Sequence, residues 1–263
     1  MVEPGPANLL ALPLELRLQI YDHVCLLDTD LETNLPYPAF RGAERTHNIP
    51  WLNLMLACRT IGTELRRHFR SFDLLDTEDE RRAYVVDLLP TADGSCLQQV
   101  LWRRIPCPPL QARRVKANLH GQHIERLQFA GRGGPSLLLR GLYQTLNYFI
   151  HCGRLLDSDR PLPWHVHLRE VVVVFQAGNS HDEPRVIALE LPKWHQEFEE
   201  LANFLAGAVH AGFLYGFVDK ITLTYGADVR TWNVEWKERV GLRERYQQYG
   251  FGWGIDTPHV DHW

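Results

Sequence analysis

Apolar and polar residues follow the three- and four-residue spacing of an amphipathic helix in two segments near the N-terminus. The first begins at Pro13, since proline is tolerated in the first turn of a helix, and is predicted to end near Leu27. Residues 28–50 contain Pro and Gly residues that interrupt helices, so we expect a long irregular connection there. The second segment, residues 51–72, is predicted to be a single helix that buries one face.

The first of these helices has two apolar stripes instead of one. At about 100° per residue, one stripe comprises Leu14, Leu18, Tyr21 and Cys25, and the other comprises Leu16, Ile20, Val24 and Leu27. A helix with two apolar stripes has two surfaces to cover, and another protein chain is one candidate for covering the second. A helix enclosed by its own domain is the alternative, and the pattern does not distinguish the two.

After residue 73 the pattern changes to the short apolar runs that are typical of β-strands. Strands are predicted over residues 82–89 and 98–105, and proline residues follow each of them. Residues 113–119 are a third candidate, whose short pattern also fits a helix or a loop.

A repeated pattern in the rest of the chain predicts parallel strands. Three segments read apolar, charged, charged, apolar, any, apolar, namely residues 124–129, 168–173 and 218–223. Each precedes a helical pattern, over residues 138–151, 194–209 and 232–249 respectively. Because neighbouring parallel strands must be joined by a crossover, three strand-helix units favour a mostly parallel sheet covered by helices.

These patterns predict an α/β fold in two parts. Residues 8–72 are expected to form a helical module, and residues 73–263 an irregular domain of βα repeats with mostly parallel strands. Whether the repeats close into a compact layer or run as a solenoid stays open. With 263 residues, of which 45% are hydrophobic, the chain is long enough for both parts.

Charge and cysteine content narrow the function classes. A net charge of -4 and a pI of about 6.3 give no overall positive field that would attract nucleic acid or an anionic membrane. The five cysteines include no Cys-x-x-Cys pair, which speaks against a disulfide framework and against a structural zinc site. No apolar run of membrane-spanning length and no secretory signal pattern is present, so an intracellular protein of the cytoplasm or nucleus is expected.

Candidate catalytic and metal sites are few. His165 and His167 would lie on one face of a strand, but no carboxylate or thiol at ligand spacing completes a metal site. Residues 256–263 contain two His and two Asp, but they lie at a chain end. Residues 131–134 are rich in glycine yet match neither nucleotide-binding fingerprint, and Ser136 has no base at motif spacing. We therefore predict no catalytic residue, no metal and no cofactor.

Two further groups of residues each have two interpretations. Aromatic residues near the C-terminus would either seal the end of the βα stack or form a binding surface; they are Trp232, Trp236, Tyr246, Tyr249, Phe251, Trp253 and Trp263. The 51–72 helix carries Arg59, Arg66, Arg67 and Arg70 beside its apolar face. These arginines could contact phosphate, but a solvated helix face is the commoner explanation.

Two motifs resemble the F-box, and more closely the F-box-like domains that are abundant in filamentous fungi. The first motif is Leu12-Pro13-Leu14-Glu15-Leu16-Arg17 with Ile20-Tyr21, and the second is Leu56-Ala57-Cys58-Arg59 with Ile61 and Glu64. The resemblance covers roughly residues 8–72, and the two motifs occur in the expected order.

The resemblance implies a helical module that docks on a Skp1-like linker protein of cullin-RING ubiquitin ligases, while the C-terminal domain captures an unknown protein target. The docking residues that it implies are Leu12, Pro13, Leu16, Ile20, Tyr21, Val24, Cys58 and Arg59. We therefore expect a non-catalytic protein-interaction adaptor. A stand-alone scaffold protein without a ligase role and an enzyme of unrecognised type are the alternatives.

Overall fold

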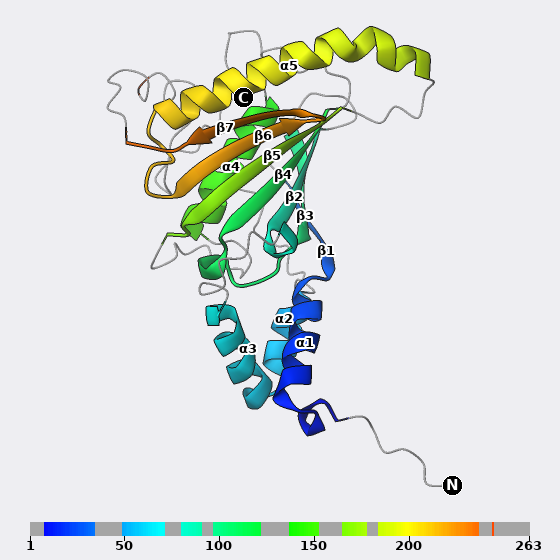
Figure 1. Ribbon diagram of the computed structural model, residues 1–263, viewed down its shortest axis with the longest axis vertical. Coiled ribbons are helices and arrows are strands. Elements are labelled where there is room, and N and C mark those ends of the chain that lie inside the picture. The colour runs from blue at the N-terminus through cyan, green and yellow to red at the C-terminus, as the bar shows by residue number, and fades with distance from the viewer. Residues whose placement is uncertain are drawn as a thin grey trace.

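Seven strands form one continuous sheet in this computed structural model (Figure 1). The structure describes residues 8–34, 49–71, 80–90, 97–121, 137–152, 165–177, 184–236 and 244. The strands are β1 (Asp28–Asn34), β2 (Tyr84–Pro90), β3 (Leu97–Arg104), β4 (Arg114–Gly121), β5 (Leu168–Ala177), β6 (Val218–Tyr225) and β7 (Asp228–Asn233). They lie side by side in the order β1-β3-β2-β4-β5-β6-β7.

The middle of the sheet is parallel and both edges are antiparallel. Neighbouring strands β2, β4, β5 and β6 run parallel, whereas β1, β3 and β7 are joined to the sheet by antiparallel pairing. The strands predicted over 82–89, 98–105, 168–173 and 218–223 are confirmed, and residues 113–119 lie in β4. The prediction of mostly parallel strands is only partly right, because three of the six pairings among the described strands are antiparallel.

Two helices make the crossovers that the parallel strands require. Helix α4 (Leu137–Cys152) joins β4 to β5, and α5 (Pro184–His210) joins β5 to β6. Helix α4 agrees with the prediction, but α5 begins ten residues before the predicted start at Trp194. Pro192 lies within α5, at a position where proline ordinarily marks a helix boundary.

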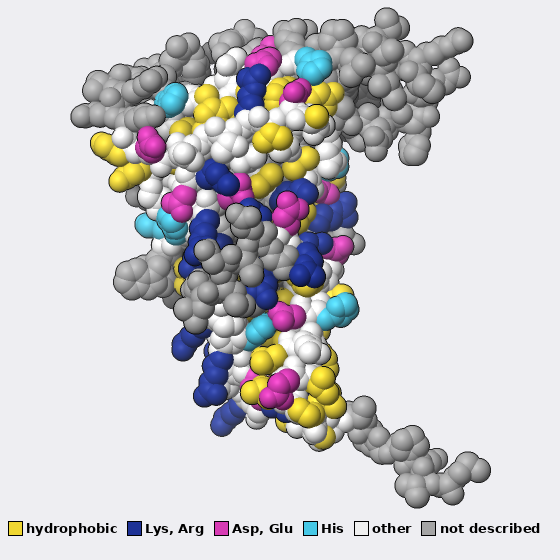
Figure 2. Space-filling model, viewed as in Figure 1, with side chains coloured by type: hydrophobic (Ala, Val, Ile, Leu, Met, Phe, Trp, Pro, Cys, Tyr) yellow, Lys and Arg dark blue, Asp and Glu magenta, His cyan; other side chains and the backbone are white. Residues whose placement is uncertain are grey.

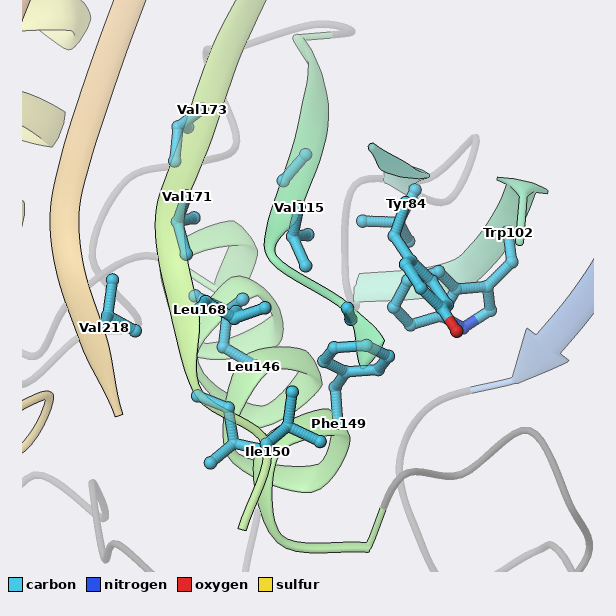
Figure 3. Packing of buried hydrophobic residues seen from close by; sticks show 14 of the residues in the cluster. Tyr84, Trp102, Val115, Leu146, Phe149, Ile150, Leu168, Val171, Val173 and Val218 are labelled. Carbon is cyan, nitrogen blue, oxygen red and sulfur yellow. The ribbon is translucent and has the colours of Figure 1, made fainter. Parts of the chain in front are cut away.

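The hydrophobic core lies on the face of the sheet that packs against α4 (Figure 3). Every second strand residue points to this face, and the side chains of Val115 and Val171 are completely buried there. The ring of Phe149 from α4 lies 4.9 Å from the ring of Tyr84 and 5.3 Å from the ring of Trp102, measured between centroids. The crossover helix and the parallel strands therefore share one aromatic and aliphatic core.

The opposite face of the sheet carries a buried carboxylate in β2. Asp87 accepts hydrogen bonds of 2.7 Å from Arg103 Nε and from Asn118 Nδ2, and His120 Nε2 lies 3.7 Å from it. Burial would by itself raise the pKa of Asp87, but the groups from His120, Arg103 and Asn118 together hold this pKa down to about 2. The carboxylate is therefore ionised and paired on this face.

A second buried carboxylate lies on the same face in β5. Glu170 accepts a hydrogen bond of 2.9 Å from Thr222 Oγ1, its Oε1 lies 2.8 Å from Lys220 Nζ, and Arg114 pairs with its other oxygen. Burial opposes ionisation, yet the bonds from Lys220 and Thr222 leave the pKa of Glu170 below its usual value. On this face of the sheet, charged and polar side chains that pair across neighbouring strands thus take the place of a second apolar layer.

The N-terminal region departs from prediction at two places. Helix α1 (Leu14–Cys25) confirms the helix that was predicted from Pro13 to near Leu27. A short 3-10 helix, η1 (Leu9–Ala11), precedes it. The irregular connection predicted over 28–50 is wrong at its start, because residues 28–34 form β1 and pair with β3. β1 lacks the apolar alternation of a strand since it is an edge strand, where polar side chains are tolerated.

The single helix predicted over 51–72 is two helices, α2 (Pro50–Ala57) and α3 (Arg59–Ser71). They part at Cys58, whose φ of -159° and ψ of 161° are those of extended backbone. The apolar spacing hid this break because both helices bury residues in one cluster, among them Trp51 and Phe69, whose rings lie 5.2 Å apart. Figure 1 shows α1, α2 and α3 together at the end of the molecule opposite α5.

Predictions for the C-terminal part are tested only in part. The helix predicted over 232–249 does not begin at Trp232, which lies in the edge strand β7 and pairs with Ile221 of β6. Residues 124–129, the first copy of the repeated strand pattern, lie outside the described residues, as do residues 237–243 and 245–263.

Candidate docking surface

Exposed apolar side chains are concentrated at the N-terminal end of the structure. We call η1, α1, α2 and α3 the N-terminal module. Seven of the eleven exposed large hydrophobic side chains in the described part of the chain belong to this region: Leu10, Leu12, Leu14, Leu16, Ile20, Leu27 and Leu56. Figure 2 shows apolar side chains gathered over the lower end of the molecule. Single exposed apolar residues are ordinary, whereas a cluster of them is a candidate interaction surface.

The second apolar stripe of α1 is open to solvent. Leu16 is 45% exposed and Ile20 is 36% exposed, while Leu27 just beyond the helix is 43% exposed. Val24 is half-buried and packs against the core. The alternative of a helix enclosed by its own domain therefore does not describe this face of α1.

The first stripe of α1 is divided along its length. Tyr21 and Cys25 are buried in the core, Leu18 is half-buried, and Leu14 at the start of the helix is 44% exposed. Burial also raises the pKa of the Cys25 thiol to about 12. The helix is thus held to the rest of the protein by its C-terminal half, while its N-terminal half presents leucines to solvent.

Leu56 extends the apolar area beyond α1. It lies in the last turn of α2 and is the most exposed large apolar side chain of the described residues, at 72%. Its neighbour Trp51, near the other end of α2, is buried and donates a hydrogen bond of 2.8 Å from Nε1 to the carbonyl of Ile105. Helix α2 is therefore anchored by one end and exposes a leucine at the other.

An ionic bridge joins the two sequence motifs. Arg17 of α1 donates hydrogen bonds of 2.7 Å and 3.0 Å to the two carboxylate oxygens of Glu64 in α3, and Tyr21 donates a third, of 2.7 Å, from its hydroxyl. Arg17 also donates to the carbonyls of Leu10 and Leu12. One guanidinium thereby holds η1, the start of α1 and α3 in a fixed arrangement.

The electrostatics of this bridge follow from its partners. The hydrogen bond from Arg17 holds the pKa of Glu64 below its usual value, although desolvation opposes the shift. Burial, and then the hydrogen bond to Glu64, raise the pKa of Tyr21 to about 12, so its hydroxyl stays protonated and donates. The bridge is thus a charged pair with a neutral donor beside it.

The second motif shapes the turn between α2 and α3. Cys58 Sγ accepts the backbone N–H of Ile61 at 3.5 Å, which caps the first turn of α3. Gly62 lies against the preceding helix so closely that a Cβ there would come within 2.7 Å of the Met55 carbonyl oxygen. The sequence thus places a thiol and a glycine where the chain turns back on itself.

The residues predicted for docking differ in how far they are exposed. Leu12, Pro13, Leu16, Ile20 and Arg59 are exposed, and Val24 and Cys58 are half-buried. Tyr21 is completely buried and donates a hydrogen bond to Glu64, so in this structure it supports the module from inside. The prediction omitted Leu10, Leu14 and Leu56, although Leu14 and Leu56 lie within the two motifs.

The structure separates the two histidines considered as a metal pair. His165 Nδ1 lies 3.0 Å from His151 Nδ1, whereas His167 Nε2 lies 3.1 Å from Asp219. No group of three or more potential metal ligands occurs among the described residues. Residues 131–134, Ser136 and residues 256–263 lie outside the described part of the chain.

Of the C-terminal aromatic residues, two are described. Trp232 is half-buried against the core, and Trp236 is 61% exposed with its ring 5.3 Å from that of Tyr215. The other five lie beyond the described residues. Trp232 thus lies within the edge strand β7, whereas Trp236 stands at the surface.

Comparisons with known proteins give no match: no family model, no curated protein and no solved structure is significantly similar to this chain. None of the helices within the described residues is both long and apolar enough to span a membrane.

Proposed function

We propose that the chain is a non-catalytic adaptor that docks through its N-terminal module on a Skp1-like linker protein and captures a protein target with its C-terminal α/β part. The observation that carries the proposal is the solvent exposure of Leu16 and Ile20 on α1. The two sequence motifs that resemble the F-box supply the identity of the partner. This function belongs to the cytoplasm or nucleus, where the free thiols of Cys25, Cys58 and Cys107 stay reduced.

The spacing of the exposed residues suits a helix that lies in an apolar groove. Leu16 and Ile20 lie four residues apart on α1, which is the anchor spacing of helix-in-groove recognition, and the exposed Leu12 lies just before the helix begins. Full burial of one leucine or isoleucine side chain contributes about 1.5–3 kcal/mol. Leu16 and Ile20 are each already partly buried, so each gains less than this full value when a partner covers it. Two or three such anchors together still contribute several-fold to the affinity without any charged contact.

Rigid presentation adds to this argument. The bonds of Arg17 to Glu64 and to the carbonyls of Leu10 and Leu12 fix the leucines of η1 relative to α1. A surface that is already ordered loses less conformational entropy when it binds. The ionic bridge therefore favours binding although it does not itself face the partner.

Co-elution tests the proposal directly. The purified full-length chain is mixed with a purified Skp1-like linker protein and run on a size-exclusion column. Formation of a stable complex at equal stoichiometry is expected, with protection of amides in residues 10–20 from hydrogen exchange. Folded chain that elutes separately from the linker protein at micromolar concentration would rule the proposed partner out.

A further inference from the structure

Helix α3 carries a second surface of different chemistry. Arg59, Arg66, Arg67 and Arg70 are all exposed, and no described carboxylate lies within ion-pair distance of their side chains. The one acidic residue of α3, Glu64, is bound by Arg17. Four positive charges therefore stand on one short helix of a chain whose net charge is -4.

Three of these arginines form a regular row. Positions 59, 66 and 70 fall within a narrow sector at 100° per residue, with the exposed Thr63 between them and Arg67 at the margin. The helical rise separates Arg59 from Arg66 by about 10 Å and Arg66 from Arg70 by about 6 Å. Figure 2 shows Lys and Arg side chains along the outer side of α3, on the flank away from the apolar area over α1.

We propose that this arginine row binds an acidic α-helix of a partner protein, with carboxylates spaced at four and seven residues. A helix laid alongside α3 has the same rise per residue, so Glu or Asp side chains at i, i+4, i+7 and i+11 lie opposite Arg59, Thr63, Arg66 and Arg70. Planar guanidinium groups match carboxylates in bidentate pairs. Arg59 is also among the residues that the F-box resemblance implies for docking, but the row as a whole follows the outer side of α3 and not the apolar area over α1, so this inference does not rest on the proposed docking function.

A protein helix fits the row better than nucleic acid does. Of the two rings within α3, Phe69 is buried and His68 is largely buried against Asp22, so the described residues of this helix offer no exposed ring on which a base could stack. A nucleic acid also carries a charge every few ångströms and would meet the negative remainder of the chain. A short helix whose carboxylates match the row needs no positive charge other than these guanidinium groups.

The probe is a synthetic Ala/Gln helix with Glu at i, i+4, i+7 and i+11, and its control has the same number of Glu residues in one block. Fluorescence anisotropy with the full-length chain at low salt should show binding of the matched helix that weakens as salt rises. The control peptide, whose Glu residues are in one block, should bind several-fold more weakly. No binding of the matched helix, equal binding of the two peptides, or tighter binding of a single-stranded RNA of equal charge would each overturn the inference.

Charge-matched variants locate the site. The triple variant R59Q/R66Q/R70Q lowers the net charge by three, as does the control Q144E/T231E/N233E, whose exposed sites lie outside the N-terminal module. The arginine variant should bind the matched helix about tenfold more weakly, whereas the control stays within about twofold of the wild type. All six positions are exposed, so folding is checked simply by circular dichroism. Equal loss in both triples would show that only net charge matters and would contradict a site on α3.

Discussion

Arg17 and Glu64, 47 positions apart in the chain, are joined by two hydrogen bonds of 2.7 Å and 3.0 Å between guanidinium and carboxylate. Both side chains are largely buried, at 13% and 14% exposure. The pair connects α1 to α3 across a segment that includes β1 of the sheet. The two motifs that resemble the F-box are therefore one structural unit, because each supplies half of the same ion pair.

Replacement of the acceptor tests this unit. Glu64→Ala leaves the buried Tyr21 hydroxyl and the Arg17 guanidinium without their shared partner. The unsatisfied hydroxyl alone is expected to lower the free energy of unfolding by about 1–2 kcal/mol in urea titrations. Glu15→Ala, at an exposed site on α1, is the control and should change it by less than about 0.5 kcal/mol. Equal effects of the two variants would show that the bridge does not stabilise the module.

A variant of Tyr21 distinguishes a residue that stabilises the N-terminal module from one that contacts the linker protein. Tyr21→Phe removes the bond to Glu64 without changing the surface, so stability should fall by about 1 kcal/mol while affinity for the linker protein stays within about twofold. Calorimetric binding and urea unfolding on the same preparation measure both quantities. A large loss of affinity with unchanged stability would mean that Tyr21 contacts the partner after all.

Gly62 allows the close packing of α3 on α2. Gly62→Ala should destabilise the protein by about 1–3 kcal/mol, although alanine is the better helix former, because its Cβ would press on the Met55 backbone at 2.7 Å. Thr60→Ala, at an exposed position of the same helix, provides the comparison in thermal unfolding. Stabilisation by Gly62→Ala would contradict the close approach.

Ionisation of Asp87 makes the free energy of unfolding depend on pH, and the direction of this dependence follows from the shift in its pKa. Its pKa is about 2 in the folded protein, below the ordinary value of 3.8, so its contribution to stability is complete above about pH 4 and is lost as the pH falls toward 2. The contribution is of the order of 1–2 kcal/mol. The difference in unfolding free energy between wild type and Asp87→Asn should therefore shrink between pH 5 and about 2.5. A difference that does not change over this range would place the Asp87 pKa at its ordinary value.

Much of the fold could be predicted from local pattern. β2, β3, β5 and β6 have apolar runs, and α1 and α4 have strong helical periodicity, so these elements were predicted within a few residues. β1 was missed because an edge strand needs no apolar alternation, and the break at Cys58 was missed because α2 and α3 share one buried cluster. The first third of α5 was missed because Pro192 lies within it and proline usually marks the boundary of a helix.

The candidate site was predictable in composition but not in exposure. The sequence identified Leu16 and Ile20 as a second apolar stripe, yet only the packing of α1 against the core shows which stripe faces solvent. The pairing of Arg17 with Glu64 depends on the approach of α3 to α1, which no local pattern reports. Leu56 is exposed for the same kind of reason, since α2 is anchored by Trp51 at its other end.

The affinity of stripe variants for a Skp1-like linker protein tests the central claim most directly. Leu16→Asp and Ile20→Asp together should weaken binding by about a hundredfold or more, because each places a charge where an apolar anchor is buried on docking. The control Val229→Asp changes an apolar residue that is 60% exposed in β7, outside the N-terminal module, and should leave the affinity within about twofold. Wild-type affinity in a folded Leu16→Asp/Ile20→Asp variant would contradict docking through α1.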